Sequence, residues 1–149
     1  WSQQLIAESL GKKKMGFLPI ISNAPKDHHI LLKLYLDGPK DKLFMIFSSE
    51  RKSKEKVNMF GNIGMNTFLN KKKLSAVKNA QKKALIKTFL KNEIPFIEFK
   101  IQTINEEVLG KLFSFFIIET VILGKLLKIN PFDQPAVEQV KKYTKKLLN

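Results

Sequence analysis

Short apolar runs alternate with longer amphipathic segments along this chain, and that order restricts its fold more than any other feature. Residues 16–22 form an apolar run bounded by turn formers, and residues 43–47 are continuously apolar, as in strands buried within a sheet. In residues 96–101, apolar and charged side chains alternate, which indicates an edge or half-covered strand. Strands that alternate with helices predict an α/β fold with a mostly parallel sheet.

Five segments have the spacing or the end signals of helices. They are residues 3–10, 28–36, 75–91, 106–127 and 135–148. Asp27 is expected to cap the second of these helices, and Gly11 suits the position after the first. The most apolar stretch, residues 112–127, is too short and too polar to span a bilayer, so we expect a buried helix and no membrane.

Composition limits the class of protein further. The chain has 149 residues, of which 44% are hydrophobic, so it is long enough for one domain with a core. It has no cysteine, which excludes disulfides and thiolate metal ligands. Residues 1–4 show no signal-peptide features and no initiator methionine. We therefore expect a cytoplasmic chain that begins inside a longer protein.

The net charge of +14 raises the question of nucleic-acid binding. Base readout and bidentate phosphate contacts favour arginine, and Arg51 is the only arginine in the chain. The lysines are spread from Lys12 to Lys146 rather than gathered in one motif, which is typical of a solvated surface. We therefore expect no nucleic-acid partner.

The most informative motif is residues 132–141, which read Phe-Asp-Gln-Pro-Ala-Val-Glu-Gln-Val-Lys. If Pro135 begins a helix, as its fixed φ and missing N–H allow, the seven residues from Gln134 to Lys141 are two turns. The two side chains then face the same way.

Two further motifs precede it. Gln4 and Glu8 are four residues apart and therefore share one helical face. Asp27, His28 and His29 begin the second predicted helix. Adjacent histidines can suggest a metal site, but neighbouring helix positions point about 100° apart. Since no acidic or cysteine cluster completes a ligand set, we expect no metal.

These segments, in this order, resemble the glucose-6-phosphate isomerase family. Residues 124–141 are similar to the family's carboxyl-terminal signature, and residues 4–12 to its Q-x-x-x-E-S-x-G-K stretch. Residues 27–39 are similar to its histidine segment, with His28 in place of the usual glutamine. The resemblance implies a three-layer αβα sugar-isomerase (SIS-type) domain with a mostly parallel sheet, over residues 1–149.

The resemblance also implies a site and a reaction. Glu8 would be the general base, His29 would open the sugar ring with Lys141 as its cationic partner, and Gln4 and Gln134 would contact the sugar phosphate. The reaction would interconvert glucose 6-phosphate and fructose 6-phosphate by proton transfer through a cis-enediol(ate). That chemistry needs one base and no cofactor.

Two segments of the family pattern are missing from the chain. The family's serine/threonine-rich phosphate loop and its Gly-Gly-Arg segment do not occur in this sequence. The domain is therefore expected to be incomplete, with the amino-terminal SIS domain absent, and inactive alone. The family implies a homodimer in which His29 serves the partner's site. The alternative is a non-catalytic SIS module that binds sugar phosphates.

Overall fold

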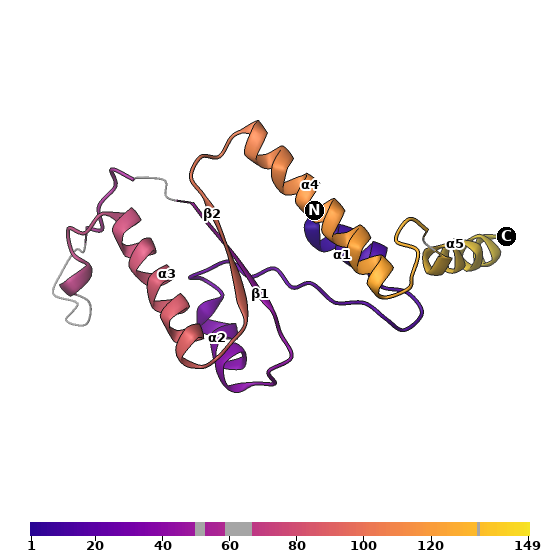
Figure 1. Ribbon diagram of the computed structural model, residues 1–149, viewed down its shortest axis with the longest axis horizontal. Coiled ribbons are helices and arrows are strands. Elements are labelled where there is room, and N and C mark those ends of the chain that lie inside the picture. The colour runs from indigo at the N-terminus through magenta and orange to yellow at the C-terminus, as the bar shows by residue number, and fades with distance from the viewer. Residues whose placement is uncertain (50–52, 59–66, 134) are drawn as a thin grey trace. The chain divides into compact units, whose positions relative to one another are not determined.

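The computed structural model describes residues 1–49, 53–58, 67–133 and 135–149 (Figure 1). The chain divides into two compact units, which are described separately. The first unit comprises Trp1–Ile21 and Glu106–Asn149, and the second comprises Ser22–Asn105. The predicted helices occur in the predicted order, and each begins and ends within one residue of its predicted bounds.

The second unit is built around a two-stranded parallel sheet (Figure 1). Strand β1 (Phe44–Ser49) pairs with β2 (Phe96–Ile101) in a register that places Phe44 opposite Phe96. Helices α2 (His28–Asp37) and α3 (Leu74–Lys91) precede β1 and β2, and a short 3₁₀ helix lies at Thr67–Leu69. The predicted mixed α/β class and the parallel direction of the strands are confirmed.

Aromatic rings form the centre of this unit. Phe89 of α3 is 1% exposed, and its ring centroid lies 4.8 Å from that of Phe44 and 6.1 Å from that of Phe96. Tyr35 of α2 meets Phe44 edge-on at 4.9 Å. Such tilted and edge-on contacts are the favoured geometry for aromatic pairs. One ring cluster therefore joins both helices and both strands.

The opposite side of the sheet is less covered. Phe47 and Ile97 point away from the Phe44–Phe96 pair, because side chains alternate along a strand. They remain 46% and 42% exposed, although the Phe47 ring stacks on that of Phe99 at 4.7 Å. An apolar sheet face with this exposure is consistent with an incomplete αβα domain.

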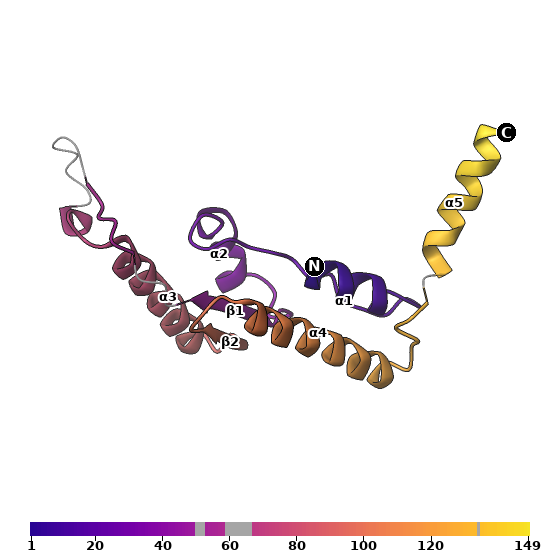
Figure 2. The same ribbon diagram turned by 90° about the horizontal axis from the view of Figure 1, so that it is seen from above.

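The first unit is organised by α1 (Ser2–Leu10) and α4 (Glu106–Leu126), which lie side by side in Figures 1 and 2. Leu10 is fully buried, and Phe116 and Thr120 of α4 are 6% and 2% exposed. The Trp1 ring packs against Phe113 at a centroid distance of 4.6 Å. The i, i+4 spacing of Phe116, Thr120 and Gly124 gives α4 one buried stripe.

The prediction that residues 112–127 form a buried helix is only half right. The residues are helical, but the side of α4 away from the buried stripe is exposed. The exposed apolar residues on that side are Phe115, Ile118, Ile122 and Leu126. Helix α1 is too short to cover a helix that is apolar around most of its circumference.

The predicted strand at residues 16–22 is wrong. These residues are irregular, and Leu18 and Ile20 are 79% and 70% exposed. Pro19 has no N–H to give a sheet, and its carbonyl instead accepts a hydrogen bond of 2.8 Å from Gln3 Nε2. An apolar run without a neighbouring strand to pair with does not form a strand.

Two helix ends also differ from their prediction. Asp27 occupies the N-cap position of α2, but its carboxylate accepts from the Asn23 N–H at 2.6 Å and makes no capping bond. Gly11 follows α1 with φ of −74°, so it does not adopt the left-handed conformation. A Cβ at Gly11 would lie 2.7 Å from the Ala7 carbonyl oxygen, which explains glycine there in another way.

Helix α5 (Pro135–Leu148) closes the chain and matches its predicted bounds. Its residues from Ala136 onward are exposed, including Val140 at 67% and Leu147 at 87%. Among the described residues, no helix has the length and apolar content that a membrane crossing needs.

Candidate functional site

Helix α1 holds two of the predicted site residues next to each other. Gln4 and Glu8 lie one turn apart, and Gln4 Nε2 donates a 3.0 Å hydrogen bond to Glu8 Oε1. Both residues are exposed on the helix surface. The predicted common face is therefore confirmed, and the Glu8 carboxylate is oriented by the amide while remaining accessible.

A tight turn after α1 sets the direction of Lys12. The Lys12 N–H donates to the Leu10 carbonyl at 2.9 Å, and the Met15 N–H donates to the Lys12 carbonyl at 2.7 Å. Lys13 and Lys14 adopt positive φ angles of 50° and 62°, which close the turn. As a result Lys12 turns inward, and only 8% of its side chain is exposed.

The chain reverses at the end of α4 in a Schellman motif. The Ile129 N–H donates to the Gly124 carbonyl at 3.0 Å, and the Lys128 N–H to the Lys125 carbonyl at 3.1 Å. Lys128 takes the left-handed conformation, with φ of 55°. Ile129 is 7% exposed, so the turn is anchored by burial as well.

The segment after this turn is shaped by its own polar groups. Asn130 Oδ1 accepts a 3.0 Å hydrogen bond from the Phe132 N–H, an Asx-type contact that fixes a bend. Pro131 lies against Gly124 of α4. We call residues 127–133 the post-α4 loop. It leads directly into Gln134, which lies outside the described residues.

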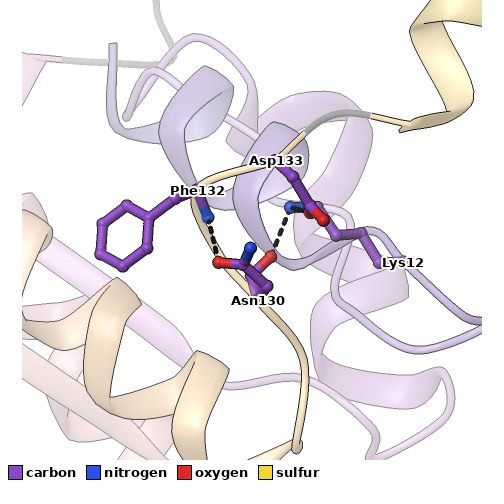
Figure 3. Close-up of polar contacts among 4 residues, drawn as sticks. All are labelled: Lys12, Asn130, Phe132 and Asp133. Atoms are coloured by element: carbon purple, nitrogen blue, oxygen red, sulfur yellow. Dashed lines mark hydrogen bonds and ion pairs between the residues drawn. The ribbon is translucent and has the colours of Figure 1, made fainter.

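Lys12 connects the end of α1 to this loop (Figure 3). Its ammonium donates to Asp133 Oδ1 at 2.7 Å and to the Asn130 carbonyl at 2.6 Å. Figure 3 shows Lys12 reaching both acceptors while the Phe132 ring points away from them. The hydrogen bond from Lys12 holds the pKa of the Asp133 carboxyl below its ordinary value. The segment at residues 4–12 and the segment at residues 124–141, which both resemble the family, are therefore in direct contact through Lys12 and Asp133.

Lys141 lies on the exposed helix α5. Its ammonium pairs with Glu138 Oε1 at 2.8 Å, one turn earlier in the same helix. The Lys141 side chain is 67% exposed. A shallow hollow of about 470 Å³ runs beside it, but Val140, Thr144 and the other residues that line it belong to α5 or to Asn149, so it is no enclosed site. That Lys141 shares a pocket with Glu8 stays a prediction.

The histidines belong to the second unit. His28 and His29 begin α2, with the His28 N–H donating to the Pro25 carbonyl at 3.1 Å. His29 is exposed and His28 is half-buried. Within the part of the chain that the structure describes, no three His, Cys, Asp or Glu side chains gather as a metal site would require.

Sequence reasoning missed three polar groups that the structure singles out. Lys12 ends the motif at residues 4–12 and begins a basic stretch, but only the structure shows its contact with Asp133. On α4, Glu119 Oε2 and Thr120 Oγ1 are buried and lack a hydrogen-bond partner among the described residues. Burial raises the pKa of the Glu119 carboxyl. A glutamate and a threonine within an apolar run were the available signal.

Comparison with known proteins finds relatives over nearly the whole chain. A glucose-6-phosphate isomerase of Methanocaldococcus jannaschii is 34% identical over 152 residues, covering 99% of this chain and 36% of the relative. A probable glucose-6-phosphate isomerase of Methanococcus maripaludis is 36% identical over 147 residues, covering 95% of this chain and 32% of the relative. The chain thus spans about a third of the length of these relatives. None of the protein-family models compared with the chain matches it.

A solved structure shares the fold. The crystal structure of a hypothetical protein from Thermus thermophilus matches 99% of this chain and 37% of its own chain, with a TM-score of 0.83 and 26% identity. The class defined by this fold and site is a mixed α/β protein with a parallel sheet and a glutamine–glutamate pair on its first helix. Over nearly its whole length the chain is a relative of the glucose-6-phosphate isomerases, which confirms the predicted resemblance.

Proposed function

We propose that this chain is part of an aldose–ketose isomerase that interconverts glucose 6-phosphate and fructose 6-phosphate. The observation that carries the proposal is its similarity, over 99% of its length, to a protein named glucose-6-phosphate isomerase. The Gln4–Glu8 hydrogen bond supports it, since the two side chains of the first motif act on one face. Glycolysis and gluconeogenesis in the cytoplasm would be its setting.

In this proposal Glu8 carries out the chemical step. Isomerisation moves a proton between C1 and C2 of the open-chain sugar through a cis-enediol(ate). One carboxylate can take that proton and return it on the same face of the intermediate. Gln4 would orient the Glu8 carboxylate through the 3.0 Å hydrogen bond and contact the sugar phosphate with its remaining polar atoms.

His29 and Lys141 would open the cyclic sugar. Ring opening needs a proton donor and acceptor at the ring oxygen and the anomeric hydroxyl, and imidazole exchanges protons readily at neutral pH. Lys141 would be the fixed cation beside it, exchanging its Glu138 contact for the substrate. We propose that Gln134 binds the sugar phosphate, and that a homodimer brings His29 to the partner's site.

The proposal treats residues 1–149 as one SIS-type domain of a longer enzyme. Since the chain spans about a third of its relatives' length, the Ser/Thr-rich phosphate loop and the Gly-Gly-Arg segment would come from elsewhere, and the chain alone would be inactive. The second candidate is a non-catalytic sugar-phosphate-binding SIS module. The presence of Glu8, His29 and Lys141 in family order favours the enzyme.

The test joins this chain to the complementary part of the Methanocaldococcus jannaschii relative, in place of the matching segment. The joined protein should isomerise fructose 6-phosphate, and the chain alone should not. Glu8→Gln should lower kcat by roughly 10²–10⁴-fold, the usual contribution of a general base. Glu55→Gln, at an exposed glutamate, is the matched control and should change little. A folded joined protein that binds the sugar phosphate without turnover would instead support the binding module.

A further inference from the structure

The side chain of Lys12 is much less exposed to solvent than those of Lys13 and Lys14. Its side chain is 8% exposed, and its ammonium makes two short hydrogen bonds, of 2.6 and 2.7 Å. Holding a lysine in one conformation costs side-chain entropy, and removing its charge from water costs solvation. Neighbouring Lys13 and Lys14 are exposed. The two hydrogen bonds offset this cost in the folded chain.

Its two acceptors lie close together in the sequence but far from Lys12. The Asn130 carbonyl and the Asp133 carboxylate are 118 and 121 residues away, and both belong to the post-α4 loop. They stand on either side of Phe132, so one ammonium fixes two points of the loop. A bend fixed at two points cannot swing away from the end of α1 without breaking both bonds.

The two segments joined in this way carry proposed site residues. Glu8 lies four residues before Lys12, and Gln134 directly follows Asp133. We infer that Lys12 is a positioning residue, which fixes the distance between the Glu8 carboxylate and the post-α4 loop through Asp133 and Asn130. The inference rests on the proposed function for its catalytic consequence. The contact of Lys12 with Asn130 and Asp133, which we call the clamp, does not depend on that function.

The clamp depends on charge at both ends. The Asp133 carboxyl has a pKa below its ordinary value, chiefly because it accepts the Lys12 hydrogen bond. A lowered carboxyl pKa means that the bond stabilises the fold above the unfolded-state pKa, and that this contribution is lost as pH falls through the folded value. The clamp should therefore hold at neutral pH and open in acid.

The mechanical arm of the test uses the whole chain without substrate. Because the chain has no cysteine, spin labels can be attached at Gln4→Cys and Phe132→Cys, both exposed positions. The distance distribution should be narrow, and Lys12→Met should broaden it. Lys14→Met, which removes an exposed charge from the same turn, should leave it unchanged. A distribution that stays narrow in Lys12→Met overturns the clamp, whether or not the protein is an isomerase.

The catalytic arm uses the joined isomerase. Misplacing a catalytic group by about 1 Å can cost roughly 10²-fold in rate. Lys12→Met and Asp133→Asn should each lower kcat toward that extent, the double variant should be no worse than the worse single one, and Lys12→Arg should restore part of the rate. A merely structural role would instead give losses of rate that follow the loss of stability alone. If the labels report a clamp and the joined enzyme turns over normally in Lys12→Met, the positioning role is refuted.

If the joined enzyme shows no turnover at all, the proposed function fails. The spin-label distances then still decide whether Lys12 holds the post-α4 loop, so the two failures can be told apart.

Discussion

Replacing Gly124 by alanine should crowd the turn between α4 and the post-α4 loop. A Cβ at Gly124 would lie 3.1 Å from Cδ and Cγ of Pro131, closer than an ordinary van der Waals contact. Gly110 is a glycine in the same helix, α4, but a Cβ there would meet no atom within 4 Å. The two glycines therefore make a matched pair, with equal chemistry and different surroundings.

The two substitutions should change the free energy of unfolding in opposite directions. Alanine in a helix interior is favoured over glycine by about 0.5–1 kcal/mol, so Gly110→Ala should raise the free energy of unfolding by that amount. At Gly124 the same gain is opposed by overpacking, which costs roughly 1–3 kcal/mol. The Pro131 ring is part of the main chain, so it cannot retreat without displacing Asn130. Gly124→Ala should thus be less stable than Gly110→Ala by about 1–3 kcal/mol.

Urea unfolding followed by tryptophan emission measures this difference. Trp1 is the only tryptophan of the chain, and its ring packs against Phe113 on α4 at 4.6 Å, so its emission reports the first unit. Equal stabilities for the two alanine variants would show that Pro131 does not rest on Gly124, and would refute the packing of the post-α4 loop against α4.

Three further comparisons test other parts of the first unit in the same assay. Leu10→Ala removes a fully buried side chain and should cost about 2–5 kcal/mol, whereas Leu18→Ala, at a residue 79% exposed, should change little. Lys128→Gly should stabilise the chain by about 1 kcal/mol because φ of 55° strains a side-chain-bearing residue, while Lys125→Gly inside α4 should destabilise it. Burial raises the pKa of Glu119, so its contribution to stability is present below the unfolded pKa and is lost as pH rises through the folded value. Glu119→Gln should accordingly gain stability over the wild type as the pH rises, and a gain that is the same at acid and alkaline pH would contradict the assignment.

Local patterns predicted the elements well where local physics decides them. Residues 135–148 and 106–127 were recognisable as helices from an initial proline and from paired glutamates at a positive helix end. The apolar run at residues 16–22 had the composition of a strand, but strand formation depends on a partner. Pairing between distant segments is not encoded in the run itself.

The site residues divide in the same way, into contacts set by local spacing and contacts set by distant segments. The Gln4–Glu8 pair follows from helical spacing alone, and the structure confirms it. Lys12 ends the motif at residues 4–12, but its contact could not be foreseen, because it depends on a loop 121 residues away and on a turn that directs the side chain inward. The exposure of α4 could not be foreseen either, since burial depends on what packs against a helix as well as on its own residues.

The central claim is that Glu8 moves the proton while His29 opens the ring, and isotope exchange separates the two steps. The joined isomerase would be given glucose 6-phosphate deuterated at C2, with loss or transfer of deuterium and anomer interconversion both followed by NMR. Glu8→Gln should stop deuterium loss and transfer yet leave anomer interconversion, and His29→Ala should mainly slow anomer interconversion. Continued deuterium loss from C2 in Glu8→Gln, at a rate near that of the wild type, would contradict the account.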